Sequence, residues 1–374
     1  CSVDGGSIKL LKDAIVDSFI DISNKTIVFD LAGKKVFIGD TIEREGGIIR
    51  VLGGGNLTID DSVGGGEIDT TSERKMKNNS VHESYNGSEP AVWTCIDVYP
   101  EIDDDKHLVN GNAKLTINGG TFKAHYYAIA GNGQCLDEDS TIVIINGGCF
   151  SPLDGSTFYH PQNGDLVIKG GTFNGKDTAI EIRAGKLKIY GGVFFSEKEP
   201  SAFNSNGNGT TSQGSAIAVA QHNTKLSIDV KISGGEFKGY HALSVVNPQN
   251  NEYDAISKIN VSVTGGMFAS TEEGVEVVNC SSEFIKIDNG SSFTIRARKA
   301  GDEGNVSVCN GTYYCDIEGA MGGTKGSNIE IALLSDIDMT GKGDSEQISF
   351  VKDSVLNLGS HRIQGTVSVG CTGN

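Results

Sequence analysis

The 374-residue sequence has little proline, no long apolar run and a shortage of positive charge. It contains 6 Pro, and its 31 Lys and Arg against 48 Asp and Glu give a formal net charge of −17. No apolar run approaches the roughly 18 residues that a helix needs to span a bilayer, so we expect no membrane span. Nucleic-acid binding needs clustered Lys and Arg, so the composition also excludes a general nucleic-acid partner.

The sequence also lacks a metal-binding signature. Its 8 Cys form no CxxC pair and no His stands at metal-ligand spacing, so we expect no zinc site. Cys309–Cys315 and Cys135–Cys149 are the nearest disulfide candidates, and buried free thiols are the alternative. Ca²⁺ is the only cofactor left open, because Asp103–Asp105 is a run of carboxylates, although solvated loop charge explains the same run.

What the chain has in abundance is glycine, 51 residues in all, much of it in one recurring phrase. An aliphatic residue and one variable residue precede Gly-Gly, and a variable residue and Phe follow. The phrase occupies residues 117–122, 145–150, 168–173, 189–194, 232–237 and 263–268, with a degenerate copy at 308–313. The first glycines are 28, 23, 21, 43 and 31 residues apart. A coil of about 21–23 residues with loop insertions explains all five intervals.

Each repeat contains two short segments that alternate apolar and polar residues, as in 179–183 and 186–190. Such alternation indicates strands with one buried face, and the double glycine permits a corner that other residues avoid. No repeat can bury its apolar face alone, so coils must stack. The sequence therefore predicts an all-β, right-handed parallel β-helix with a row of stacked rings formed by Phe122, Phe150, Phe173, Phe194, Phe237, Phe268 and Tyr313.

The two ends of the chain share a second repeat. Residues 10–13 and 29–36 match residues 333–336 and 356–363, with offsets of 323 and 327. We therefore expect one β-helix module over residues 1–327. Residues 328–374 would begin a second similar module or add C-terminal coils to the same solenoid.

With its Leu-Leu-x-Asp, Asp-Leu-x-Gly-Lys and Gly-Gly-x-Phe phrases, the chain resembles the pectate-lyase-like right-handed β-helix superfamily. It is most similar to the adhesive or carbohydrate-binding modules of gut bacterial surface proteins and phage fibres. The resemblance covers nearly the whole chain, but its motifs are core and corner residues, which specify fold and not activity. It implies an extracellular or cell-surface location, which the frequent Asn-x-Ser/Thr sequons also suit.

Aligning the repeats on Gly-Gly suggests a polar cluster on one outward face. The alignment places His160 beside Glu181 and Gln162 beside Arg183, because stacked strands lie about 4.8 Å apart. The same two columns continue through Ala218, Ser244 and Glu276, and through Ala220, Val246 and Val278. His160, Glu181 and Arg183 are the candidates for acid–base catalysis, and a surface ladder of ion pairs is the alternative.

Sugar binding often uses exposed aromatic rings, so aromatic residues are the second lead. The candidate binding residues are Gln162, Arg183, Trp93, Tyr159 and Tyr240. Trp93 is equally well explained as a core residue. The expected function is a non-catalytic module for adhesion or glycan recognition, with glycans or a host surface as partners and no metal site. A polysaccharide lyase or glycoside hydrolase and a structural spacer are the alternatives.

Overall fold

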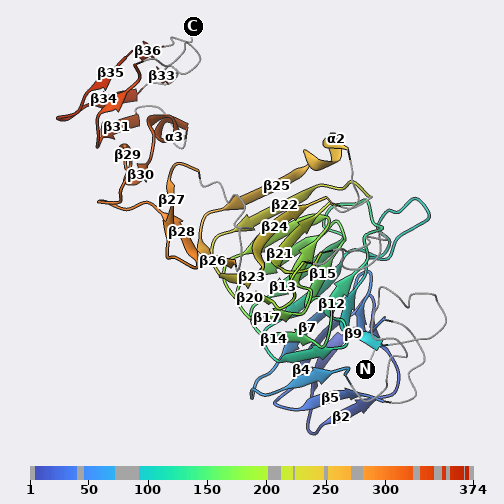
Figure 1. The fold of residues 1–374 in the computed structure, drawn as a ribbon. Coiled ribbons are helices and arrows are strands. Elements are labelled where there is room, and N and C mark those ends of the chain that lie inside the picture. Colours follow the sequence, from blue (N-terminus) through green and yellow to red (C-terminus); the bar gives the residue numbers. More distant parts are fainter. Residues whose placement is uncertain are drawn as a thin grey trace. The chain divides into compact units, whose positions relative to one another are not determined.

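The structure, a computed structural model, describes most of the chain (Figure 1). The described residues are 5–39, 46–71, 92–200, 212–221, 224–247, 252–270, 281–322, 329–340, 348–350, 354–365 and 367–369. They form two compact units. The first consists of residues 1–262, 266–277 and 290–292, and the second of residues 263–265, 278–289 and 293–374.

Three parallel sheets build the first unit, and the chain visits them in turn. Sheet A contains, in spatial order, β1 (Gly5–Lys9), β4 (Thr26–Asp30), β7 (Asn56–Asp60), β10 (Ala113–Ile117), β13 (Thr141–Ile145), β16 (Asp165–Ile168), β19 (Gly185–Ile189), β22 (Ile228–Ile232) and β25 (Ile259–Val263). Sheet B contains β2 (Ala14–Val16), β5 (Lys35–Ile38), β8 (Glu67–Asp69), β11 (Thr121–Ala124), β14 (Cys149–Pro152), β17 (Thr172–Gly175), β20 (Val193–Ser196), β23 (Glu236–Gly239) and β26 (Gly266–Ser270). Sheet C contains β3 (Ile20–Ile22), β6 (Gly46–Val51), β9 (Val92–Val98), β12 (Tyr127–Gly131), β15 (Phe158–His160), β18 (Thr178–Ile182), β21 (Ser215–Ala220) and β24 (His241–Val246).

The register of the sheets gives the length of a coil. Thr172 pairs with Cys149 of the coil before it and with Val193 of the coil after it, which are offsets of 23 and 21 residues. Leu166 pairs with Leu187, again at 21 residues. The predicted all-β parallel solenoid with coils of about 21–23 residues is therefore confirmed.

A row of phenylalanine rings runs through the interior of the first unit. Neighbouring rings are stacked with centroids 4.8–4.9 Å apart and planes within 15° of parallel. The ring spacing equals the usual spacing of paired strands, so each ring fills the space between its neighbours without leaving a gap. The members of the row are Phe122, Phe150, Phe173, Phe194, Phe237 and Phe268.

The two glycines before each Phe have different reasons to lack a side chain. The second has a positive φ, 111° at Gly171 and 116° at Gly192, which other residues rarely adopt. The first packs on the preceding coil. A Cβ on Gly170 would lie 3.0 Å from the carbonyl oxygen of Asn146, and one on Gly191 would lie 3.0 Å from that of Lys169.

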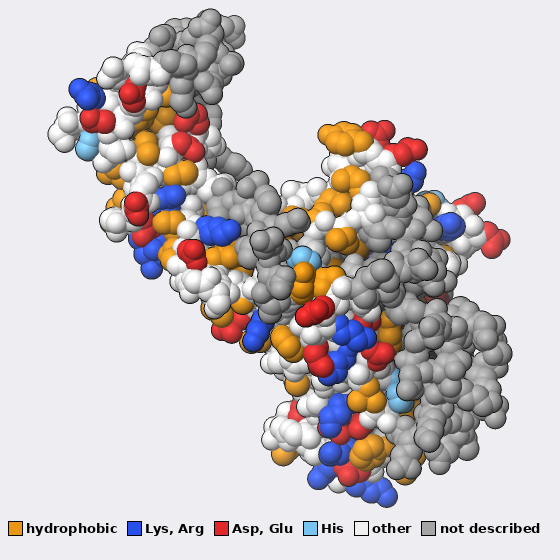
Figure 2. Space-filling view, viewed as in Figure 1, with side chains coloured by type: hydrophobic (Ala, Val, Ile, Leu, Met, Phe, Trp, Pro, Cys, Tyr) orange, Lys and Arg blue, Asp and Glu red, His pale blue; other side chains and the backbone are white. Residues whose placement is uncertain are grey.

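The exposed surface of the first unit carries charges of both signs, interspersed over the face seen in Figure 2. Lys186, for example, lies 3.4 Å from Glu138 and 3.2 Å from Asp139. Among the described cysteines, neither of the two disulfides considered from sequence is formed. These cysteines all carry thiols, namely Cys95, Cys135, Cys149, Cys309 and Cys315. A short helix, α2 (Tyr253–Ile256), precedes β25.

The second unit begins with antiparallel hairpins. β27 (Phe284–Asp288) pairs with β28 (Phe293–Ala297), and β29 (Ser307–Cys309) pairs with β30 (Thr312–Tyr314). Tyr313 lies on this second hairpin, so the prediction that it continues the phenylalanine row is wrong. The turn is Asn310-Gly311, both with positive φ, which is the strongest short signal for a hairpin.

Two parallel coils follow in the second unit. β31 (Ile329–Leu333) pairs with β34 (Ser354–Asn357), β32 (Ile337–Asp338) with β35 (Ile363–Gln364), and β33 (Ile348–Phe350) with β36 (Val367–Val369). The core of this unit also includes residues of α3 (Ile317–Gly322). The sequence match between the chain ends therefore falls on parallel coils in both places. Whether a module boundary lies at residue 328 stays a prediction.

The phenylalanine row generates a prediction about stability. Phe173→Ala should lower the free energy of unfolding by about 3–5 kcal/mol, because it leaves a cavity that the rings of Phe150 and Phe194 cannot both fill. Thr172→Ala, on the outward face of the same strand, should change it by no more than about 0.5 kcal/mol. Urea unfolding followed by circular dichroism measures both. Equal effects of the two substitutions would contradict the internal row.

Candidate functional site

The register of sheet C changes the predicted polar column. β15 pairs with β18 so that Tyr159 lies opposite Glu181 and His160 lies opposite Ile182. The prediction that His160 and Glu181 are neighbours in one outward column is therefore wrong, and Tyr159 occupies the place expected for His160. The same column continues through Ala218 and Ser244.

His160 faces the interior of the solenoid. Its ring is fully buried, lies 6.0 Å from that of Phe158, and places Nε2 3.2 Å from the carbonyl oxygen of Gly164. Burial lowers the pKa of His160 to about 4, because the charged imidazolium is poorly solvated there. Since side chains alternate along a strand, His160 and Glu181 point to opposite faces of sheet C.

The outward face of sheet C brings together three of the predicted residues, Tyr159, Glu181 and Arg183. Arg183 Nη1 donates to the Tyr159 hydroxyl at 2.9 Å, and Arg183 Nε lies 3.7 Å from Glu181 Oε1. The backbone N–H of Ser212 donates to Glu181 Oε2 at 3.1 Å. Both charged side chains have 0% exposure. The cluster is therefore a buried, charge-paired group and not an open ladder on the surface.

The other binding candidates have different surroundings. Gln162 is fully buried. Its side-chain amide packs so closely against Gly131 that a Cβ on Gly131 would collide with it. Tyr240 is half-buried, with its ring edge-on to that of His241 at 4.8 Å. Trp93 lies on β9, but its side chain is outside the described residues, as are Glu276 and Val278.

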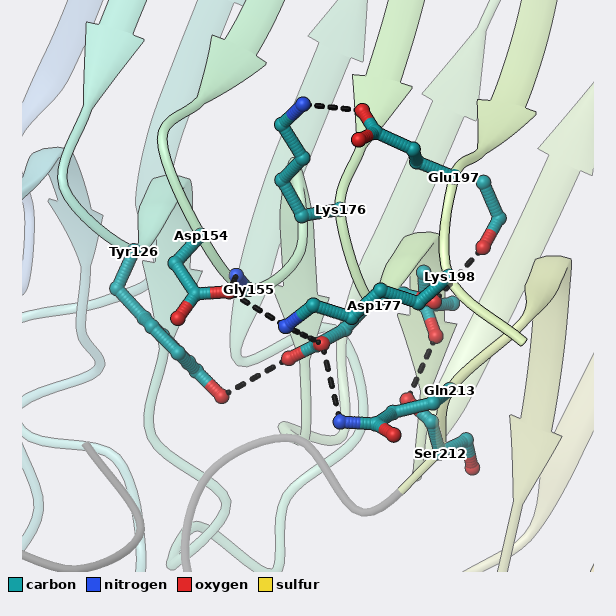
Figure 3. A network of polar contacts seen from close by, with 11 residues as sticks. Tyr126, Asp154, Gly155, Lys176, Asp177, Glu197, Lys198, Ser212 and Gln213 are labelled. Atoms are coloured by element: carbon teal, nitrogen blue, oxygen red, sulfur yellow. Dashed lines mark hydrogen bonds and ion pairs between the residues drawn. The ribbon is translucent and has the colours of Figure 1, made fainter. Parts of the chain in front are cut away.

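A polar network that the sequence prediction missed lies where sheet B turns into sheet C (Figure 3). Its centre is Asp177, which is 2% exposed. Asp177 accepts hydrogen bonds from the Tyr126 hydroxyl at 3.2 Å, Lys198 Nζ at 2.7 Å and Gln213 Nε2 at 3.1 Å. Lys198 also donates to Asp154 at 2.6 Å, so its ammonium lies between two carboxylates.

The network holds both ends of the connection from β20 to β21. Lys198 attaches the first end to Asp154 and Asp177. Gly214 attaches the second end, because its N–H donates to the Asp177 carbonyl oxygen at 2.7 Å. Asp177 thus contacts both ends of the insertion expected between Ser196 and Gly214. Residues 201–211 of this insertion lie outside the described part.

Two ionisable groups of this network have shifted pKa values. Burial alone lowers the pKa of Lys198, but hydrogen bonds to Asp154 and Asp177 outweigh it, so the pKa is raised overall. Burial raises the pKa of Tyr126 above its usual range, so its hydroxyl stays protonated and donates to Asp177. Each donor therefore keeps its proton at neutral pH, which suits a permanent structural contact rather than proton transfer.

A second buried charge lies further along sheet C. Asp97 lies opposite Arg50 on the neighbouring strand, and Arg50 lies opposite Asp21 on the next strand. The Arg50 guanidinium also forms an ion pair with the Asp21 carboxylate. Asp97 Oδ2 accepts the N–H of Gly47 at 2.5 Å. Burial nevertheless raises the pKa of Asp97 to about 6, because desolvation outweighs this hydrogen bond and the nearby guanidinium.

Within the ranges that the structure describes, no three His, Cys, Asp or Glu side chains are grouped so that they could hold a metal ion. Asp103–Asp105 lies in an exposed turn closed by two hydrogen bonds: the Asp103 N–H donates to the His107 carbonyl oxygen, and the His107 N–H donates to Asp103 Oδ1. Among the described helices, none is long and apolar enough to cross a membrane. No family model, curated protein or solved structure matches the chain.

The Asp177 network generates a second prediction. Asp177→Asn should lower the free energy of unfolding by about 1–3 kcal/mol, since it removes charge-assisted hydrogen bonds from a buried site. It should also speed hydrogen exchange at the Gly214 amide. Glu197→Gln is the matched control, because it breaks only the exposed Lys176–Glu197 pair and should change stability by less than about 1 kcal/mol. Equal exchange rates at Gly214 in both variants would contradict the role of Asp177.

Because His160 and Asp97 are buried, a third prediction concerns the pH dependence of stability. The two residues should change stability with pH in opposite directions. The folded pKa of His160, about 4, lies below the ordinary value of 6.5, so its stabilising contribution is complete above pH 6.5 and is lost as the pH falls towards 4. The folded pKa of Asp97, about 6, lies above the ordinary value of 3.8, so its contribution is complete below pH 3.8 and is lost as the pH rises to 6.

Single substitutions separate the two contributions. Relative to the wild type, His160→Leu should gain stability as the pH falls from 6.5 to 4, and Asp97→Asn should gain it as the pH rises from 4 to 6. Each difference should reach roughly 2–3 kcal/mol, since one pKa unit corresponds to about 1.4 kcal/mol. Urea unfolding at half-unit pH steps measures both curves. Curves parallel to that of the wild type would show that neither group is buried as described.

Proposed function

We propose that this chain is a non-catalytic β-helix module that recognises glycans or host surfaces outside the cell. In this proposal it is part of a larger tandem-repeat surface protein or phage fibre of the pectate-lyase-like superfamily. The resemblance of the Gly-Gly-x-Phe coils and of the phrases near the chain ends supports the family. The parallel coils at the end of the second unit favour a tandem arrangement.

One observation favours recognition over catalysis, namely the burial of the candidate acid–base groups. A general acid or base must come within hydrogen-bond reach of its substrate. Glu181 has 0% exposure and is occupied by the Ser212 N–H and by Arg183. His160 faces the interior and is held neutral. The groups that would act on a polysaccharide therefore stabilise the fold instead.

The scaffold itself also favours recognition. Stacked coils repeat the same outward positions at the strand spacing, which produces the extended surfaces that solenoids use for binding. The net charge of −17 repels polyanions and favours neutral partners. This supports neutral glycans over acidic polysaccharides as ligands.

A glycan-array screen with detection of new reducing ends tests the proposal. We expect binding without product release, both for the wild type and for Glu181→Gln, which keeps the size of the buried side chain. Product formation that Glu181→Gln abolishes would overturn the proposal in favour of a lyase or hydrolase. Neither binding nor product would leave the structural spacer as the function.

A further inference from the structure

The corner at which sheet A turns into sheet B carries an exposed column of polar side chains. Each member lies at the end of a sheet A strand, either as its last residue, which is Asp60, or directly after it. Backbone hydrogen bonds of 2.8–2.9 Å join each coil to the next at this position. We call this column the corner ladder, and its members are Asp60, Asn118, Asn146, Lys169, Tyr190 and Ser233.

The first half of the corner ladder is a chain of side-chain hydrogen bonds. Asn146 Nδ2 donates to Asn118 Oδ1 at 2.7 Å, and Asn118 Nδ2 donates to Asp60 Oδ1 at 2.6 Å. Each amide has two N–H donors and a carbonyl oxygen with two lone pairs, so these bonds leave further donors and acceptors at the surface. Both amides are exposed and oriented by their neighbours, which lowers the entropy lost when a hydroxyl-rich ligand binds.

The second half of the corner ladder presents an aromatic ring. Tyr190 is 57% exposed and stands between Lys169 and Ser233, which are also exposed. An isolated exposed tyrosine is common and needs no explanation. Here the ring stands in line with the oriented amides, two coils beyond Asn146, or roughly 10 Å at the usual strand spacing.

The backbone directly after the corner ladder is largely free of side chains. Every member of the corner ladder except Asp60 is followed by two glycines, at 119–120, 147–148, 170–171, 191–192 and 234–235. At Gly147, Gly170, Gly191 and Gly234, the first glycine of the pair packs closely against a carbonyl oxygen of the preceding coil. A consequence is that a ligand lying along the ladder can approach the backbone closely on that side.

We propose that the corner ladder binds a linear neutral glycan that runs along the solenoid axis. The amides of Asn118 and Asn146 bind its hydroxyl groups, and the ring of Tyr190 stacks on a sugar face. Successive rungs are one strand spacing apart, about 4.8 Å, which is close to the repeat of an extended pyranose chain. The ladder carries one acid and one base, Asp60 and Lys169, so it offers no net charge to a polyanion. The inference rests on the proposed glycan recognition and names its site.

Calorimetric titration of the full chain tests this site. The probes are cellohexaose, xylohexaose and mannohexaose, with cellobiose, xylobiose and mannobiose as short counterparts and a galacturonate hexamer as the anionic one. At least one neutral hexamer should bind at least about tenfold more tightly than its disaccharide. Tyr190→Ala should weaken that binding about tenfold, the effect of losing one ring–ligand stack, and Asn146→Ala should weaken it as well.

Tyr253→Ala is the matched control, because Tyr253 is 81% exposed on α2 and lies outside the corner ladder. It should leave the affinity unchanged, and urea unfolding should show that all three variants are folded. Hexamer binding that neither Tyr190→Ala nor Asn146→Ala weakens would overturn the ladder as the site while leaving glycan recognition intact. A preference for the galacturonate hexamer would overturn the neutral ligand. No binding of any neutral hexamer here, together with a blank glycan array, would overturn both proposals.

Discussion

Coil-on-coil stacking of phenylalanine rings is the contact on which the first unit depends. Six rings follow one another at 4.8–4.9 Å, the distance at which paired strands also lie. Because a ring displaced by one residue would point outward, the row fixes the register of sheet B. The glycine corners then carry that register into the neighbouring sheet. The outward columns are a consequence of this interior row.

The interior could be predicted from sequence because its requirements repeat in the six coils from Phe122 to Phe268. Gly171 needs a positive φ and Phe173 needs a neighbouring ring, so the same residues recur at the same place. The outward face of sheet C could not be predicted as well. The path from Phe150 to Phe158 is one residue longer than the path from Phe173 to Ile180, although Phe158 and Ile180 pair. One extra residue in a turn reverses which side chains face outward.

The same irregular turns explain why the Asp177 network was missed. Asp154, Asp177 and Lys198 are 23 and 21 residues apart, which is one coil each. An alignment of the repeats on these turns places the three residues together, whereas an alignment on Gly-Gly compares residues of the strands only. Buried polar groups between sheets B and C thus stabilise the scaffold. The second proposal places the ligand at the exposed corner between sheets A and B.

A disulfide that forms only in the correct register tests the stacked-coil arrangement most directly. Cys149 is a free thiol that pairs in register with Thr172 across sheet B. Thr172→Cys should therefore bond to Cys149 on mild oxidation, since paired strands place two Cα atoms within the range that disulfides accept. Asn174→Cys, two residues further along the strand, lies on the longer diagonal and should not. Peptide mapping by mass spectrometry detects the disulfide. A bridge to Cys149 in Thr172→Cys alone is the predicted result and supports the register. No bridge in Thr172→Cys, or an equal bridge in Asn174→Cys, would contradict it.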